Sequence, residues 1–406
     1  MDNKKNGIPK LRFPGFTGAW EQRKLGEVAE INPSSEIPDN FEYVDLESVV
    51  GTEMIAYRRE NKKTAPSRAQ RLAKKGDIFY QTVRPYQKNN YHFNLTRKDF
   101  VFSTGYAQLR PNINGDFLFV YIQLSNFVNE VLNRSTGTSY PAISPSNLIR
   151  MKVAIPTNNE QEKIGAFFKQ LDSLIALHQR KLEHLQEQKK GLLQKMFPKN
   201  GETVPEVRFP GFTDAWEQRK LGEVGKTFTG LSGKTKEDFG HGDAHFVTYM
   251  NVYSNPISDP NMVENVEIDT KQQEVKKGDV FFTTSSETPE EVGMSSVWLS
   301  DAPHIYLNSF CFGFRPIVNI FNPYYLAYLL RSNNIRNKMM ILAQGISRYN
   351  ISKNKVMKLN VTIPNIREQQ KIGEFFKQLD FLITLHQRKL DHLELMKKGL
   401  LQQMFV

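Results

Sequence analysis

The chain carries the same sixteen-residue stretch twice. FPGFTGAWEQRKLGEV occupies residues 13–28 and FPGFTDAWEQRKLGEV occupies residues 209–224, and the copies differ only in having Gly18 in one and Asp214 in the other. A second repeat follows each copy, since EKIGAFFKQLDSLIALHQRKLEHLQEQKKGLLQKMF ends the first half and QKIGEFFKQLDFLITLHQRKLDHLELMKKGLLQQMF ends the second. Internal repeats mark structural units that recur in the fold, so we expect the same architecture twice.

The segments between the repeats, residues 29–155 and 225–363, have diverged, and we call them the first and second body. They still share a skeleton of a Lys-Gly-Asp before an apolar strand, an Arg-Pro pair, and a last strand closed by Ile-Pro, at 75–80, 110–111 and 151–156 and at 277–282, 315–316 and 359–364. Duplication without functional meaning explains alike repeats, but not why bodies of the same age differ so much more. We therefore expect the repeated segments, which we call the frames, to share one task, and the bodies to recognise different targets.

The second repeat predicts a long helix with a coiled-coil seam. Apolar residues recur at alternating spacings of four and three, as in a heptad pattern. In the first copy the seam is Ile164, Phe168, Leu171, Ile175, His178, Leu182, Leu185, Lys189, Leu192 and Met196, and the second copy repeats it from Ile372 to Met404. Such a helix would be about 57 Å long. If the two helices pack antiparallel, His178 and His386 lie close together near the middle of the seam.

These patterns predict a mixed α/β (α+β) fold of two similar globular domains, separated by two long antiparallel coiled-coil helices with pseudo-two-fold symmetry. We place a first domain at 1–157, a spacer helix at 158–198, a second domain at 199–365 and a second spacer helix at 366–406. The single cysteine excludes an intrachain disulfide and fits a reducing cytoplasm. No apolar run approaches the ~20 residues that a membrane helix needs, and MDNKKNG at the start is no signal peptide. The net charge of +11 favours a polyanionic partner.

Taken together, the frame FPGFTxAWEQRKLGEV, the closing Ile-Pro, the EQxKIGxFFKQLD helix and their duplication resemble the specificity subunit of type I restriction-modification systems. The resemblance covers essentially the whole chain. It implies that each body is a target recognition domain and that the chain binds a bipartite, asymmetric sequence in double-stranded DNA. It also implies two modification subunits, which methylate adenine, and two restriction subunits, which cleave DNA.

The same resemblance implies that this chain is not itself an enzyme and binds no cofactor or metal, whereas the assembled complex uses S-adenosylmethionine, ATP and Mg. We expect the near-identical frames to bind the modification subunits. The predicted partner-binding residues are Trp20, Lys163, Lys169 and Arg180 with their counterparts Trp216, Lys371, Lys377 and Arg388. The alternative for the two tryptophans is that they fill the cores of their own domains.

Three short motifs hint at chemistry but are incomplete. Residues 322–325 read Asn-Pro-Tyr-Tyr, which lacks the second proline of an amino-methyltransferase motif and opens an apolar run that predicts a helix. GLSGKT at 230–235 has Phe228 where a phosphate-binding loop requires glycine. His241 and His245 are four residues apart, yet they lie in a loop-like region without a further metal ligand in sight.

Polar loops with interleaved aromatics predict where DNA is read. Arg and Lys suit guanine, Asn and Gln suit adenine, and a carboxylate accepts from the cytosine amine. The loops are TVRPYQKNNY (82–91) and TGTSYPAIS (136–144) in the first body, and TTSSETPEE (283–291) and GISRYNIS (345–352) in the second. The predicted DNA-binding residues are Arg84, Tyr86, Gln87, Lys88, Asn89, Asn90, Ser139, Tyr140, Lys234, Ser285, Ser286, Glu287, Arg348, Tyr349 and Asn350.

Two other classes of function remain open on the sequence. The chain could be a two-headed DNA-binding regulator that acts without partners, or an enzyme with a fused methyltransferase. A regulator would bind DNA tightly alone, an enzyme would transfer methyl groups alone, and a specificity subunit would require its modification partner. Neither the target sequence nor the spacer length can be deduced from the chain.

Overall fold

The computed structural model describes residues 7–406, which form two compact units. The first unit runs to Gln179 and also contains Arg388–Val406, whereas the second is Arg180–Gln387. The long helices are α5 (Asn158–Lys195) and α10 (Ile366–Met404), and each contributes one part to each unit. Each unit thus combines one body with parts of both long helices.

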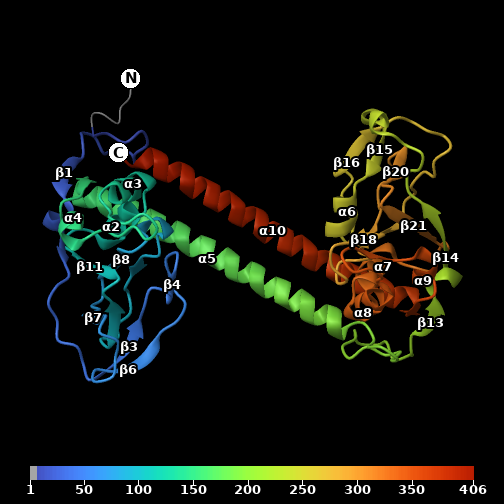
Figure 1. Cartoon of the computed structure of the whole chain (residues 1–406), viewed down its shortest axis with the longest axis horizontal. Coiled ribbons are helices and arrows are strands. Elements are labelled where there is room, and N and C mark those ends of the chain that lie inside the picture. Colours follow the sequence, from blue (N-terminus) through green and yellow to red (C-terminus); the bar gives the residue numbers. More distant parts are fainter. Residues whose placement is uncertain (1–6) are drawn as a thin grey trace. The chain divides into compact units, whose positions relative to one another are not determined.

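The first body is built on two four-stranded sheets (Figure 1). In the first sheet, β2-β11-β8-β9, all neighbours are antiparallel, and the strands are Ala29–Ile31, Tyr106–Pro111, Ile78–Gln81 and Tyr91–His92. In the second, β6-β3-β10-β7, only β3 and β10 are parallel, and the strands are Arg58–Asn61, Asn40–Val44, Phe100–Ser103 and Ala69–Leu72. A small ladder joins β4 (Val49–Val50) to β5 (Glu53–Met54).

Strand β8 explains the apolar run that follows the first Lys-Gly-Asp. Its side chains alternate between two cores, because successive residues of a strand point to opposite faces. Ile78 and Tyr80 join the main core of the unit, whereas Phe79 stacks on Phe102 of the second sheet with ring centroids 3.6 Å apart. A strand buried on both faces cannot show the polar alternation of a surface strand.

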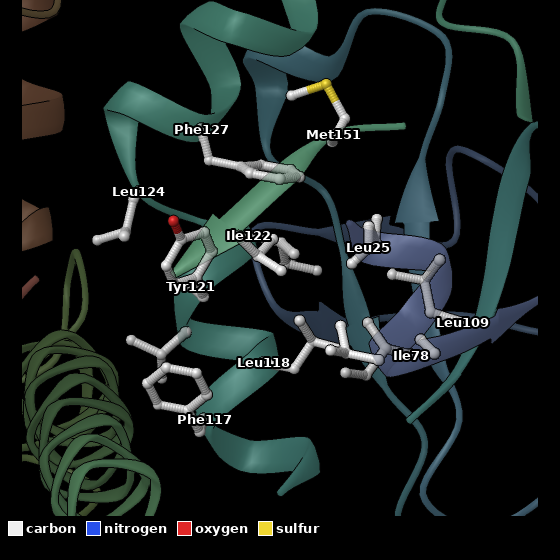
Figure 2. Packing of buried hydrophobic residues seen from close by; sticks show 14 of the residues in the cluster. Leu25, Ile78, Leu109, Phe117, Leu118, Tyr121, Ile122, Leu124, Phe127 and Met151 are labelled. Carbon is white, nitrogen blue, oxygen red and sulfur yellow. The ribbon is translucent and has the colours of Figure 1, made fainter. Parts of the chain in front are cut away.

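Helices cover the main core of the first unit. They are α1 (Leu25–Val28), α2 (Gly115–Ile122), α3 (Ser125–Asn133) and α4 (Pro145–Ile149), with a short 3-10 turn η2 at Pro85–Gln87. Figure 2 shows Leu118 and Ile122 of α2 directed toward Leu25, Ile78 and Leu109. Asn114 is the N-cap of α2, since its side chain accepts a hydrogen bond from the Phe117 amide.

The second body repeats this plan with different strands. One sheet is β14-β21-β17-β19, formed by Gly225–Thr229, Cys311–Pro316, Val280–Thr283 and Ser295–Val297. The other is β16-β15-β20, formed by Val263–Val266, Phe239–Val247 and Ile305–Leu307, and β15 and β20 are parallel. The helices are α6 (Tyr249–Ser254), α7 (Pro323–Leu330), α8 (Asn333–Leu342) and α9 (Lys353–Val356), with 3-10 turns η3 (Leu221–Glu223) and η4 (Lys236–Asp238). The predicted helix after Asn-Pro-Tyr-Tyr is confirmed as α7, with Asn322 as its N-cap.

The shared Lys-Gly-Asp and Arg-Pro motifs meet in both bodies. Asp77, which is 1% exposed, accepts a hydrogen bond from Arg110 Nε at 2.9 Å, and Asp279 binds Arg315 Nη2 at 2.6 Å. Each pair joins the start of the central strand (β8 or β17) to the end of its neighbour (β11 or β21). Each motif therefore requires the other, because the loss of either partner would leave a buried charge unpaired.

Each frame folds back onto its own body. Strand β1 (Glu21–Lys24) pairs antiparallel with β12 (Lys152–Ile155), the strand that ends in Ile-Pro, and β13 (Glu217–Lys220) pairs in the same way with β23 (Asn360–Ile363). In addition, Arg12 Nη2 lies 2.6 Å from Glu160 and Arg208 Nε lies 2.6 Å from Glu368. The fronts of the frames are thus bound to the first turns of the long helices.

Within each unit the long helices pack antiparallel along the predicted seam. In the first unit Asp172 of α5 pairs with Lys397 of α10 at 2.6 Å, and Phe168 contacts the later residue Phe405 with ring centroids 5.9 Å apart. In the second unit the counterpart ion pair joins Lys189 to Asp380 at 2.5 Å. The lysine at the seam of each helix is therefore neutralised by an aspartate of the other helix.

The two seam histidines fall in different units, His178 in the first and His386 in the second. Their proximity therefore stays a prediction. Both make contacts of their own. Among residues 7–406, no helix is both long and apolar enough to cross a membrane.

Candidate nucleic-acid interface

Two of the predicted DNA-reading loops have the same backbone scaffold. In the first body Thr136 and Ala142 exchange both backbone hydrogen bonds, each 2.9 Å long, and in the second body Gln344 and Asn350 do so at 2.9 and 2.8 Å. We call residues 136–142 and 344–350 the closed loops. Their second positions, Gly137 and Gly345, have φ of 91° and 141°, a region that only glycine enters without strain.

In each body the closed loop meets the loop that leaves the central strand. The Arg84 amide donates to the Pro141 carbonyl at 2.8 Å, and the Ile143 amide donates to Thr82 at 3.0 Å. In the second body β18 (Ser285–Ser286) pairs with β22 (Tyr349–Asn350), and the Ile351 amide donates to Thr284 at 2.9 Å. The structure thus brings the four predicted clusters together as two surfaces, one in each body.

The residues at the tips of the closed loops are exposed and chemically different. Tyr140 is 61% exposed, and the guanidinium of Arg84 lies 4.2 Å from its ring centroid, a cation–π geometry. The second closed loop presents Arg348, which is exposed, and Ile346, which is 96% exposed. The two closed loops therefore share their backbone hydrogen bonds but differ in the side chains at their tips, as two loops that bind different sequences require.

Other predicted residues of the first body support the loop instead of facing solvent. Asn90 is only 1% exposed, and its side chain accepts from the Gln81 amide at 2.7 Å and donates to Gln123 Oε1 at 3.1 Å. Lys88 donates to the Gln123 carbonyl at 2.8 Å, and Asn89 accepts from the Gly51 amide at 2.9 Å. We therefore assign Asn90 and Lys88 to loop support, while Tyr86 and Gln87 remain exposed.

The second body requires similar revisions. Ser285 and Ser286 are each 7% exposed, and the Ser286 hydroxyl donates to the Thr288 carbonyl, so neither side chain is free for a base. Glu287 and Asn350 are exposed, and Tyr349 is half-buried. Of the four predicted residues that remain accessible here, Glu287, Arg348 and Asn350 carry groups that can pair with base edges.

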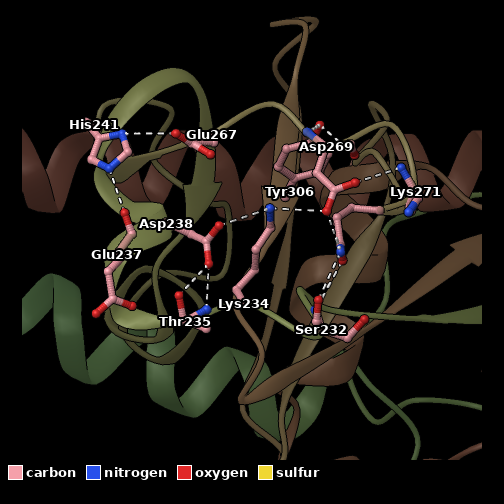
Figure 3. Close-up of polar contacts among 11 residues, drawn as sticks. Ser232, Lys234, Thr235, Glu237, Asp238, His241, Glu267, Asp269, Lys271 and Tyr306 are labelled. Carbon is pink, nitrogen blue, oxygen red and sulfur yellow. Dashed lines mark hydrogen bonds and ion pairs between the residues drawn. The ribbon is translucent and has the colours of Figure 1, made fainter.

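Lys234 is bound by carboxylates of two neighbouring loops of the second body (Figure 3). Its ammonium lies 3.1 Å from Asp269 and 3.8 Å from Asp238. Burial alone would lower the pKa of Lys234, but the hydrogen bond and charge of Asp269 outweigh it and raise that pKa above its ordinary value. We therefore assign Lys234 to the loop scaffold, since a phosphate would have to displace two carboxylates.

The histidine pair in the same region gives no metal site in the structure. His241 lies 2.6 Å from the Glu237 carbonyl through Nε2 and 3.7 Å from Glu267 through Nδ1 (Figure 3). No group of three or more His, Cys, Asp or Glu within residues 7–406 is placed to share a metal ion.

The sequence did not indicate which residues support the loops that follow β8 and β17. Gln123, directly after α2, holds Lys88 and Asn90 in the first body. In the second body Arg336 of α8 donates to the carbonyls of Glu290, Val292 and Gly293 at 2.7 to 2.8 Å, and burial lowers its pKa to about 10.

We expect Asn90→Ala to lower the free energy of unfolding by about 1–3 kcal/mol, because it leaves the buried Gln81 amide without its acceptor. The matched control is Tyr86→Ala in the same loop, which removes a half-exposed ring and should change stability by less than about 0.5 kcal/mol. Urea denaturation of the full chain measures both. Equal stability of Asn90→Ala and the wild type would return Asn90 to the candidate base readers.

The predicted partner-binding residues divide into two groups. Trp20 and Trp216 are 4% and 2% exposed and pack against Phe405 and Phe197, so their alternative placement in the domain cores is the one that the structure shows. The charged residues lie on or near the surface. Lys169 pairs with Asp116 at 2.9 Å and Lys377 with Glu374 at 3.4 Å, while Arg180 and Arg388 are exposed.

Equivalent cation–π contacts between a lysine and a phenylalanine occur in the two frames. Lys163 lies 5.0 Å from the ring centroid of Phe16, and its counterpart Lys371 lies 5.1 Å from that of Phe212. In both cases the lysine of the long helix covers the phenylalanine of the FPGF motif. The frames therefore repeat in surface geometry as well as in sequence.

The family described as the type I restriction modification DNA specificity domain matches residues 18–187 and again residues 213–395. These two matches span most of the chain, which therefore belongs to this family. The resemblance stated from the sequence and the mixed α/β fold class with long helices are confirmed. The comparisons give no support to a stand-alone regulator.

Individual relatives point the same way. The type I restriction enzyme MjaVIII specificity subunit of Methanocaldococcus jannaschii is 22% identical over 335 residues, which cover 76% of this chain and 73% of that protein. The HindI specificity subunit of Haemophilus influenzae is 24% identical over 229 residues, which cover 54% of this chain and 49% of that protein.

Solved structures share the fold. The S subunit of a type I restriction-modification system from M. genitalium aligns with a TM-score of 0.57 at 14% identity, covering 98% of this chain and 99% of that one. A chain from a study of complex assembly and conformational transition in the type I R-M system aligns with a TM-score of 0.51 at 22% identity, again covering 98% and 99%.

Proposed function

We propose that this chain is the DNA-recognition subunit of a type I restriction-modification complex, in which each body reads one half of a bipartite, asymmetric target. One observation carries the proposal. Two family domains in one chain hold closed loops of the same scaffold but different tips, 136–142 and 344–350, on nearly identical frames. Identical readers would recognise a symmetric site, whereas different tips on one scaffold recognise two different sequences.

Loop residues that are exposed or, in the case of Arg84, half-buried supply the chemistry for base reading. Arg84 and Arg348 suit guanine, Asn350 suits adenine, and Glu287 can accept from the cytosine amine. Tyr140 offers an apolar ring to the same surface. The net charge of +11 attracts the DNA backbone without regard to sequence.

The frames would bind the protein partners. Because Lys163 and Lys371 have matching surroundings, they suit two copies of one partner, and we assign them to two modification subunits. Two restriction subunits would complete the complex. This chain would contribute recognition and no catalysis, the complex would use S-adenosylmethionine, ATP and Mg, and the assembly would act in the cytoplasm.

Co-expression with the modification subunit of the native host tests the proposal. We expect native mass spectrometry to find two modification subunits per chain, and Lys163→Glu or Lys371→Glu alone to leave only one. Lys62→Glu, an exposed substitution in the first body, is the matched control and should keep both. A complex that holds a single modification subunit regardless of these variants would refute the assignment of the frames, and methyl transfer by the isolated chain would refute the absence of catalysis.

A further inference from the structure

Most arginines of the first body have acidic partners. The paired arginines are Arg58 with Asp45 and Glu60, Arg59 and Arg97 with Glu42 and Asp99, Arg110 with Asp77, and Arg134 with Glu130. Within residues 7–406, Arg68, Arg71 and Arg84 form no ion pair. Arg150 also forms no ion pair. It is set apart from these three because it lies beside α1, where the Leu25 amide donates to the carbonyl of Met151.

The backbone ties Arg68 to the DNA-reading loop. The Thr104 amide donates to the Arg68 carbonyl at 2.8 Å. In the same turn the Gly105 carbonyl accepts from the Thr82 amide at 2.9 Å and from the Thr82 hydroxyl at 2.8 Å. Arg84 follows Thr82 by two residues. The turn at Thr104 and Gly105 is therefore hydrogen-bonded on one side to the segment that carries Arg68 and on the other to the segment that carries Arg84.

Arg71 lies at the junction of the two sheets. It stands opposite Phe102 in the β7–β10 ladder, and residues directly opposite share a face of the sheet. Phe102 in turn stacks on Phe79 of β8, the strand that leads to Arg84. The side chain is half-buried, its Nε is buried without a hydrogen-bond partner, and burial lowers the pKa of Arg71. A guanidinium kept in this state gains from a bound anion.

We propose that Arg68 and Arg71 form a phosphodiester-binding surface that holds the DNA backbone beside Arg84 and the first closed loop. This inference rests on the proposed function. A guanidinium fits a phosphate in a bidentate way, and phosphate contacts fix the register of a protein on DNA without reading sequence. Arginines that already have a carboxylate partner cannot serve equally, because DNA would have to displace that partner.

The second body lacks this arrangement. The carbonyl that accepts from the amide and hydroxyl of Thr284, at 3.0 and 2.8 Å, belongs to Phe310 where the first body has Gly105. Phe310 is 58% exposed, and the neighbouring closed loop carries Ile346. The surface therefore makes the first body the more salt-dependent half of the binding site.

Salt dependence of binding tests the proposal. The full chain, in the assembly in which it purifies, is titrated with a random-sequence duplex of about 30 base pairs at several salt concentrations. Each phosphate contact contributes about 0.9 to the slope of log K against log salt. We expect Arg68→Gln to reduce the slope by about 0.9 and Arg68→Gln with Arg71→Gln by about 1.8, with the ranking of different duplexes unchanged.

Two controls separate charge from structure. Arg59→Gln removes a paired arginine of the same sheet and should leave the slope unchanged, and Arg71→Lys should retain it because the charge remains. An unchanged slope in Arg68→Gln, whose side chain is exposed and can be replaced without loss of packing, overturns the phosphate surface while leaving the proposed function intact. Failure of the wild-type assembly to bind any duplex would instead overturn the proposed function itself.

Discussion

Replacing residues 29–155 with the equivalent body of a relative should change one half of the recognised site completely and leave the other half as it was. Both closed loops are held by contacts inside their own bodies, such as the Ile143–Thr82 hydrogen bond in the first and the Ile351–Thr284 bond in the second. Changes at sites that share no contacts add nearly independently. Each base pair that the new body misreads should cost about 1–3 kcal/mol at its own position.

The exchange keeps the backbone pairing between frame and body, and the new body must supply an apolar partner for Trp20, which packs against Phe117. Strand β12 enters with the new body and pairs with β1 of the retained frame, a contact that tolerates different side chains. Methylation mapping of the chimera reads both half-sites at once. The matched control replaces 225–363 and should change the other half, and a chimera in which both halves change together would contradict modular recognition.

Glu368→Gln should destabilise the chain by about 3–5 kcal/mol, because it removes the carboxylate from a buried ion pair and leaves a buried guanidinium uncompensated. Glu368 is 0% exposed at its side chain and Arg208 11%, and Arg208 bonds both carboxylate oxygens, at 2.6 and 2.8 Å. The pair joins the front of the second frame to the first turn of α10, so its loss frees two segments that the repeat keeps together.

Urea denaturation with the slope of the transition recorded measures this effect. The control is Glu374→Gln on the same helix, where the partner Lys377 is 46% exposed and Glu374 51%, and the expected change is below about 0.5 kcal/mol. Replacing both members of the buried pair by apolar residues should restore much of the loss. A cost of less than about 1 kcal/mol for Glu368→Gln would show that the frame is held by its strand pairing alone.

Local periodicity was sufficient to predict the long helices and their seam. A heptad pattern depends only on neighbours along one chain segment, and Ile164, Phe168 and their counterparts are buried as expected. The shared Lys-Gly-Asp and Arg-Pro motifs were also visible, but nothing in the sequence indicated that Asp77 and Arg110 bind one another. Contacts between residues far apart in sequence depend on the tertiary fold.

The dependence of long-range contacts on the tertiary fold also explains why some predicted DNA-binding residues have other roles in the structure. Asn90 and Lys234 have the polarity of surface loop residues, and only the positions of Gln123 and Asp269 reveal that their side chains are already engaged. Conversely, the sequence does not distinguish Arg68 and Arg71 from the other arginines, because an arginine without an acidic partner is recognised only in the tertiary structure. The loops could be predicted as groups, since both bodies place them after equivalent strands.

Mapping of methylated adenines in the genome of the native host, with and without the gene for this chain, tests the central claim most directly. We predict one interrupted motif of two unlike halves, separated by a gap of fixed length, that is methylated in the parent and unmethylated everywhere in the deletion strain. Restoring the gene should restore the same motif. Persistence of that motif in the deletion strain, or the loss of a continuous or palindromic motif in its place, would contradict the account.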